Sequence, residues 1–160
     1  MNGDIEEIPA HMFESCCALN KLKLPARLKT IGTDAFSGCG VEEMKLPDTV
    51  TTIAEEAFEF SYVRKIALSK GMKTIPHRAF YASNLRAVYI PASMEKIDVG
   101  AFENCALTDI YYGGSEADWA AMKVESTGNE ALTKATIHYN ASVSDLGLTE
   151  EFSLLSLLGL

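Results

Sequence analysis

The chain has 160 residues, of which 48% are apolar and 22% charged, so it suits one packed domain or one short stack of repeats and not a disordered chain. Its 14 lysine and arginine residues against 22 aspartate and glutamate residues give a net charge of −8, which argues against nucleic acid as a partner. No apolar run reaches the ~18 residues that span a bilayer, and the acidic residues 1–7 do not resemble the start of a signal peptide.

The charge is unevenly distributed along the chain. Residues 1–90 hold 11 basic and 11 acidic side chains, whereas residues 91–160 hold 3 basic and 11 acidic ones. Between residues 61 and 94 there are six basic side chains and no acidic one. This stretch is either an ordinary solvated face or a band that attracts anions on an otherwise acidic protein.

A phenylalanine recurs along the chain at intervals of 23, 22, 22 and 22 residues. The five positions are Phe13, Phe36, Phe58, Phe80 and Phe102. An isoleucine precedes each phenylalanine by five residues, and an apolar trio with the spacing L-x-x-L-x-L follows it. A unit of this length cannot bury its own apolar face, so the units are predicted to stack and share one continuous core.

Each unit predicts the same local structure. The end of the apolar trio alternates and predicts a short strand, and equivalent strands are expected to lie parallel, about 4.8 Å apart. The segment around the isoleucine predicts a shorter extended piece on the opposite side. The Ala-Phe pair predicts a tight, 3₁₀-like corner at which the phenylalanine rings stack along the core.

The pattern L-P-x-x-L-x-x-I-x-x-x-A-F-x-x-C-x-L-x-x-I-x-L-P resembles the BspA-type leucine-rich repeat of bacterial surface proteins. The match is close between Lys45 and Val63, which enclose Ile53 and the Ala57-Phe58 pair. The resemblance implies a β-rich, α/β-type fold, a right-handed leucine-rich-repeat solenoid of about five 22-residue repeats with a small C-terminal cap. It also implies an extracellular or cell-surface location, as part of a longer secreted protein that adheres to host matrix proteins or to other cells.

The chain divides into leucine-rich repeats at 1–112, a capping segment at 113–140 and a Leu-rich tail at 141–160. In the capping segment, Ser115 is expected to cap a short helix that runs through Trp119 and Met122. Residues 136–139 are expected to add a final strand.

The tail has a helical period of apolar residues. Leu148, Phe152, Leu155 and Leu158 follow this period, with Thr149 in the position of an N-cap. The tail is interpreted either as an amphipathic helix that packs on the array or on a second chain, or as an artificial tail without fixed structure.

The cysteines do not indicate a metal site. Cys16, Cys17, Cys39 and Cys105 include no C-x-x-C pair, so zinc is not expected. Cys39 and Cys105 stand where other repeats carry serine, which indicates a structural role for a small, half-polar side chain. Cys16 or Cys17 with Cys39 is the only pairing of adjacent repeats that allows a disulfide.

No repeated position brings a nucleophile to a histidine and a carboxylate, so the protein is predicted not to be an enzyme, with no catalytic residues, no metal site and no cofactor. Binding is expected instead on the exposed face of the strands, which is the usual recognition surface of a solenoid. One outward row on this face reads Lys21, Glu43, Lys65, Ala87, Asp109. The next row reads Lys23, Lys45, Ala67, Tyr89, Tyr111.

These rows predict a protein-binding strip formed by Lys23, Lys45, Lys65, Tyr89 and Tyr111. The lysines are suited to an acidic contact, and the tyrosines to an apolar contact of large area. The alternative is that lysine and tyrosine are simply good strand residues. A homodimer through the open N-terminal edge of the array, or through the C-terminal tail, is a further expectation.

The expected function is therefore non-catalytic protein binding, with no nucleic acid as partner and no membrane span. As the resemblance implies, the protein ligand is a component of the host extracellular matrix or of another cell. Two alternatives stay open: a structural spacer or assembly module that binds nothing, and an intracellular interaction scaffold. Four cysteines without an obvious disulfide set favour the scaffold.

Overall fold

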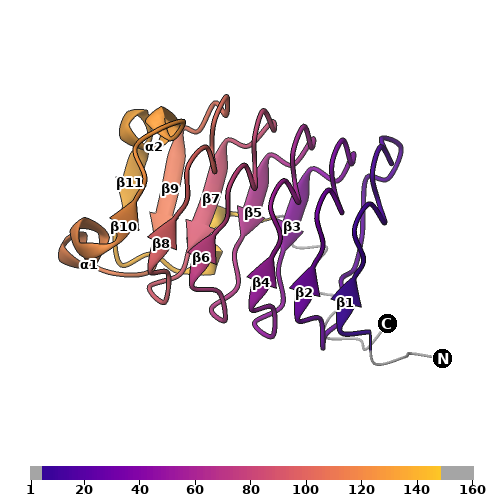
Figure 1. The fold of residues 1–160 in the computed structure, drawn as a ribbon. Coiled ribbons are helices and arrows are strands. Elements are labelled where there is room, and N and C mark those ends of the chain that lie inside the picture. Colours follow the sequence, from indigo (N-terminus) through magenta and orange to yellow (C-terminus); the bar gives the residue numbers. More distant parts are fainter. Residues whose placement is uncertain (1–4, 149–160) are drawn as a thin grey trace.

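The computed structural model describes residues 5–148, which form a solenoid of parallel strands with about five turns (Figure 1). One long side is a five-stranded sheet in the order β11-β9-β7-β5-β3. Its strands are β3 (Glu43–Lys45), β5 (Lys65–Ala67), β7 (Ala87–Ile90), β9 (Asp109–Tyr112) and β11 (Thr136–His138). The parallel strands predicted from the apolar trios are thereby confirmed.

The opposite side carries two three-stranded sheets of very short strands. The first holds β1 (Glu7–Ile8), β2 (Thr30–Ile31) and β4 (Thr52–Ile53). The second holds β6 (Thr74–Ile75), β8 (Lys96–Ile97) and β10 (Lys123–Val124). Each repeat thus contributes its isoleucine segment to one side and its trio to the other, as the period predicts.

The first trio departs from the prediction. Residues 19–24 form no strand, and the five-stranded sheet begins at β3. Leu19, Leu22 and Leu24 are only partly buried, although they pack against the core. This segment lies within the 23-residue interval between Phe13 and Phe36, which is the spacing that departs from 22.

The core is built around a ladder of stacked phenylalanine rings. Neighbouring ring centroids along the five phenylalanines lie 5.3, 5.1, 5.3 and 5.4 Å apart, with interplanar angles of 17° or less. The rings at 36, 58, 80 and 102 are essentially inaccessible to water. This confirms the predicted ring stack and gives each internal ring a contact on both faces.

Each corner is set by two residues in the left-handed backbone region, one two residues before the phenylalanine and one two residues after it. The first set is His11, Asp34, Glu56, Arg78 and Gly100, and the second is Ser15, Gly38, Phe60, Ala82 and Asn104. Their φ angles lie between 49° and 66°. Most of these residues are not glycine, so their left-handed backbone needs stabilisation by hydrogen bonds to the neighbouring repeats. The amide of Phe58, for example, donates to the carbonyl of Ala79 at 2.9 Å.

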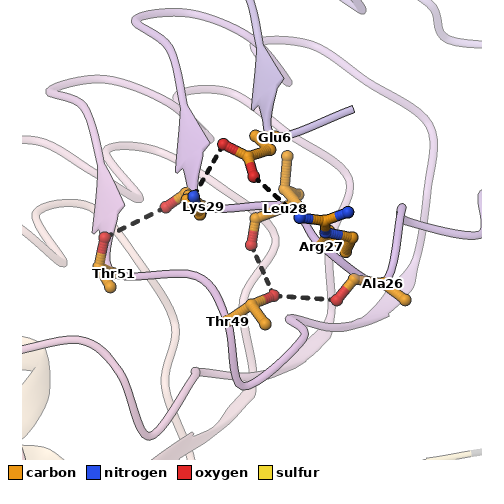
Figure 2. A network of polar contacts seen from close by, with 7 residues as sticks. All are labelled: Glu6, Ala26, Arg27, Leu28, Lys29, Thr49 and Thr51. Carbon is orange, nitrogen blue, oxygen red and sulfur yellow. Dashed lines mark hydrogen bonds and ion pairs between the residues drawn. The ribbon is translucent and has the colours of Figure 1, made fainter. Parts of the chain in front are cut away.

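Hydroxyl side chains join neighbouring turns between the sheets. The Thr49 hydroxyl donates to the carbonyls of Ala26 and Leu28, and the Lys29 ammonium pairs with Glu6 at 2.8 Å (Figure 2). Ser93, which stands at the equivalent position two repeats after Thr49, donates in the same way to the carbonyl of Met72. These bonds satisfy carbonyl groups that the short strands leave unpaired.

The repeat between those of Thr49 and Ser93 bonds its equivalent carbonyl group, that of Val50, in a different way. Gly71 stands in the equivalent place, and a Cβ built there lies 2.6 Å from the carbonyl oxygen of Val50. Ser69, where other repeats have proline, instead donates its hydroxyl to that oxygen at 2.6 Å from a fully buried position. Ser69 and Gly71 therefore act as a pair.

The capping segment closes the C-terminal end of the array. Helix α1 (Glu116–Ala121) begins after Ser115, which forms a capping box with Asp118, and the final strand is β11; both were predicted. Helix α2 (Glu130–Lys134) follows Asn129, a residue that is 2% exposed.

Asn129 takes the place of the next repeat. Its Oδ1 accepts from the amide of Phe102 at 3.0 Å, and its Nδ2 donates to the carbonyls of Asp98 and Glu125. In the preceding repeats the amide of the ladder phenylalanine donates to a backbone carbonyl of the following turn. A side-chain amide thus imitates the missing backbone, which the sequence analysis did not predict.

Candidate protein-binding face

The outward residues of the five-stranded sheet lie in the two rows predicted from the repeat. Lys65 pairs in register with Glu43 on one side and Ala87 on the other. Tyr89 pairs with Ala67 and Tyr111 in the same way, and His138 on β11 extends this row. The predicted residues from β3 onward are therefore brought together on one face.

The half of the face near β3 is rich in lysine. Lys21, Lys23 and Lys45 are exposed. Lys65 is half-buried, and its Nζ lies 3.9 Å from a carboxylate oxygen of Glu43. This half offers positive charge on a protein whose net charge is −8.

The half near β9 is covered by the chain itself. Residues 141–148, the covering segment, run back across the outside of the sheet, and their 3₁₀ helix η1 (Val143–Leu146) packs against β5, β7 and β9 (Figure 1). Leu146 is 3% exposed and Tyr89 only 5% exposed. Ala67, Ala87, Tyr89 and Leu146, with Tyr111, Val143 and Leu148 at its margin, form a small apolar cluster, the face cluster.

The expectation that Tyr89 is an exposed strand residue is therefore wrong. The position faces outward as the register predicts, but the covering segment lies over it. Tyr111 remains half-buried, and its ring stacks on that of His138 with centroids 4.6 Å apart. The helix predicted in the tail falls, apart from Leu148, outside the described residues.

The covering segment is held by bonds at both ends. At its start, the amides of Asn140 and Ala141 donate to the carbonyls of Gly114 and Tyr112 at 2.8 and 2.9 Å. At its end, the Lys65 ammonium donates to the carbonyl of Gly147 at 2.8 Å. Lys65 thus marks the border between the lysine half and the covered half.

Internal bonds shape the covering segment into a tight turn. The Asp145 carboxylate accepts from the amide and the hydroxyl of Ser142, and Gly147 ends the turn in the left-handed region at φ 62°. The bonds from Ser142 hold the pKa of Asp145 below its ordinary value because they stabilise the charged carboxylate. The sequence signals that could have revealed the turn are the Ser-x-x-Asp capping box and the glycine after it.

A polar pair flanks the covered half. His138 Nε2 lies 2.8 Å from a carboxylate oxygen of Asp109. The pKa of Asp109 is lowered by the hydrogen bond with His138 first and then by that with Thr108. The pair joins β9 to β11 and holds the ring of His138 against Tyr111.

Comparison with known proteins identifies the repeat. A family model described as the BspA type leucine rich repeat region matches six copies over residues 6–119. The chain belongs to this family. Membership indicates a protein-interaction module, and leucine-rich-repeat solenoids are typically non-enzymatic. BspA-type repeats are typical of bacterial surface proteins.

The fold is also similar to a solved structure, that of a leucine-rich repeat protein from Bacteroides ovatus ATCC 8483. The identity is 25% and the TM-score 0.53, over 67% of this chain and 34% of that one. The BspA-type chain therefore spans about a third of the length of that protein. No curated protein matches the chain, and none of the helices described is long and apolar enough to cross a membrane.

Three cysteines of this BspA-type array, Cys16, Cys39 and Cys105, pack in or against the core, whereas Cys17 is exposed. All four thiols are free. Burial raises the pKa of the Cys39 and Cys105 thiols, which keeps them protonated, and the Cys105 thiol donates to the carbonyl of Phe80 at 2.9 Å. Cys105 also lies 3.4 Å from the Ser83 hydroxyl of the preceding repeat, in the small-residue slot that the sequence predicts.

Two further features of the surface lie outside the five-stranded sheet. Asp34, Glu56 and Glu59 gather at one corner, where burial and then the two neighbouring carboxylates raise the pKa of Glu59. A shallow hollow on the side of the smaller sheets is lined by Thr51, Thr52, Ile53, Lys73, Thr74 and Pro76. This lining holds no carboxylate, histidine or cysteine that could serve as a general base.

Proposed function

We propose that this BspA-type chain is a non-catalytic protein-binding module of a bacterial surface protein, and that it attaches to host matrix proteins or to other cells through the face of the five-stranded sheet. The observation that supports this proposal is the lysine-rich half of that face, which carries the exposed Lys45 and the half-buried border residue Lys65. The exposed Lys23 belongs to the segment 19–24, which forms no strand. The strands β3, β5, β7, β9 and β11 form one continuous sheet, and a surface of this extent suits a protein better than a small molecule.

The lysine half gives the proposed contact its chemistry. Positive side chains on a protein of net charge −8 select an acidic patch on the partner and steer its approach. Tyr111 stands at the far end of the same row and adds an aromatic contact beside the covering segment. Tyr89 takes no direct part while the covering segment lies over it.

The test is a binding assay against a panel of purified extracellular-matrix proteins and whole cells. The Lys23→Glu/Lys45→Glu variant is expected to lose at least about tenfold in affinity because like charges then face each other. The same variant is expected to remove most of the dependence of binding on salt.

The matched control is the Lys70→Glu/Lys123→Glu variant, which makes the same charge change at exposed positions outside the five-stranded sheet. Its affinity is expected to stay within about twofold of wild type, since mutations of distant surface charges act weakly. An equal loss in both variants contradicts the assignment to this face. No binding by the wild-type chain to any member of the panel contradicts the proposal and favours a structural spacer.

A further inference from the structure

The covered half of the sheet contains a hollow made by two alanines. In one outward row Ala67 stands between Lys45 and Tyr89, and in the other Ala87 stands between Lys65 and Asp109. The neighbours in both rows, Lys45, Tyr89, Lys65 and Asp109, are all larger than alanine, so the small side chains of β5 and β7 leave a depression between them. Leu146 fills this depression and is itself 3% exposed.

The hollow is independent of the repeat core. The face cluster lies on the outside of the sheet and shares no member with the buried core that the phenylalanine ladder organises. The repeats therefore retain their core whether or not Leu146 sits in the hollow.

The bonds that hold the covering segment are few. The covering segment adds no strand to the sheet. One side chain of the sheet bonds to it: the Lys65 ammonium donates to the carbonyl of Gly147. A backbone bond joins its first residue to β9, where the amide of Ala141 donates to the carbonyl of Tyr112 at 2.9 Å. The remaining attachment is the apolar contact of Leu146, with Val143 and Leu148 beside it. A segment with so few contacts opens locally without unfolding of the array.

We infer that the hollow between Ala67 and Ala87 is a docking pocket for one aliphatic side chain of a partner protein, and that residues 141–148 are its internal, competing occupant. The partner presents a leucine on a tight turn, with a backbone carbonyl placed for Lys65 and acidic residues that continue toward Lys45. The inference rests on the proposed binding role of the face and adds the chemistry of the ligand to it.

Competition from the covering segment determines which ligands the pocket selects. A segment attached to the same chain has an effective concentration in the millimolar range, so a short peptide with the leucine alone displaces it poorly. A partner that also contacts the lysine half gains interactions that the covering segment does not make. The covering segment is therefore displaced only by ligands that contact both halves of the face.

The experiment uses the 160-residue chain and a synthetic peptide with the sequence of residues 141–148 as the probe. The Leu146→Ala variant empties the pocket, and binding is followed by the amide chemical shifts of Ala67, Ala87 and Tyr89. The peptide is expected to bind this variant at least about tenfold more tightly than wild type, because the internal competitor is weakened. A peptide with alanine in place of its leucine is expected to bind at least about tenfold more weakly than the parent peptide.

A second variant fills the pocket from the protein side. Ala67→Leu in the Leu146→Ala background is expected to abolish peptide binding without loss of fold, since the neighbouring row positions carry Lys45 and Tyr89. Val124→Ala, an exposed aliphatic residue on β10, is the control and is expected to behave as wild type. The far-ultraviolet circular dichroism of every variant confirms that the array is folded.

Three results overturn the inference: equal affinity of the peptide for wild type and Leu146→Ala, no binding to either, or unchanged binding after Ala67→Leu. A wild-type dimer that dissociates on Leu146→Ala also overturns it, because the occupant is then a second copy of this chain. The Lys23→Glu/Lys45→Glu variant keeps the pocket, so it is expected to bind the short peptide normally even if no matrix protein is recognised. Failure of the proposed function and failure of this inference are thereby told apart.

Discussion

Two apolar clusters lie on opposite sides of the same strands, one inside the solenoid and one outside it. The repeat core is assembled from positions that recur every 22 residues, and each internal ring of its phenylalanine ladder contacts a ring on both faces. The face cluster is assembled from positions that the repeat leaves variable, Ala67, Ala87 and Tyr89, and from Leu146, which belongs to no repeat. The periodic residues therefore determine the fold, whereas the variable positions between them shape the surface.

The difference is also one of energy. A ladder phenylalanine is buried by both neighbouring repeats, so its loss leaves a cavity that the rigid stack cannot close. Leu146 is buried by a sheet on one side and by its own short segment on the other, so its loss releases the segment. Mutations in the two clusters should therefore differ in kind as well as in size.

The largest effect is expected in the centre of the ladder. Phe58→Ala should lower the free energy of unfolding by about 3–5 kcal/mol, because the ring is buried and stacked on Phe36 and Phe80. Urea denaturation followed by circular dichroism measures it. Phe60→Ala, two residues away with a 56% exposed ring, should cost under about 1 kcal/mol; equal losses from both changes would show that the ladder is not the core.

The next effect is expected at the end of the ladder. Asn129→Ala removes three hydrogen bonds from a buried site and should lower the free energy of unfolding by about 2–4 kcal/mol, because the amide of Phe102 and two carbonyls lose their partner. The exposed Asn84 provides the control, and Asn84→Ala should leave the denaturation midpoint nearly unchanged. A small effect at Asn129 would mean that the capping segment does not continue the repeat core.

A different response is expected in the face cluster. Leu146→Ala should lower the free energy of global unfolding by less than about 2 kcal/mol, since only the contacts of one side chain and a short segment are lost. Amide hydrogen exchange of residues 143–147 should accelerate at least about tenfold while the ladder amides keep their protection. Accelerated exchange throughout the array would contradict the independence of the two clusters.

The smallest effect concerns pH and the pair that flanks the face cluster. The folded state lowers the pKa of Asp109 from its ordinary value of 3.8, so the charged carboxylate contributes stability above that value, and this contribution is lost as the pH falls through the lowered pKa. Asp109→Asn should therefore destabilise the protein slightly at pH 7, by under about 1 kcal/mol for so exposed a pair, and no longer at pH 2. Denaturation curves of both proteins at the two pH values check the sign, and a stability difference that grows toward low pH would contradict it.

The repeat made most of the fold predictable. The spacing of Phe13 to Phe102 predicted the ring stack, the trios predicted β3, β5, β7 and β9, and Ser115 predicted α1. Asn129 escaped prediction because its role depends on a side chain that imitates backbone, which leaves no periodic signal. The strand expected at residues 19–24 is absent although Leu19, Leu22 and Leu24 have the spacing of the other trios, so the apolar pattern alone does not determine strand formation.

The face was predicted only in part. The register of Lys45, Ala67, Tyr89 and Tyr111 followed from the period. The exposure of Tyr89 did not follow from it, because the covering segment, which belongs to no repeat, lies over that side chain. The two alanines were the available clue, since small side chains in rows of large ones leave room for another group. Leu146 stands at no repeat position, so the sequence pattern did not indicate that it packs on the face.

The most direct measurement of the central claim is a nuclear Overhauser spectrum of the 160-residue chain with labelled leucine and alanine methyl groups. The structure predicts contacts from the Leu146 methyl groups to the methyl groups of Ala67 and Ala87 and to the ring of Tyr89. These contacts should vanish when Ala67→Leu fills the hollow, while contacts along the phenylalanine ladder remain. Absence of the Leu146 contacts in the wild-type chain, with the Tyr89 ring open to solvent, would contradict a covered half of the face.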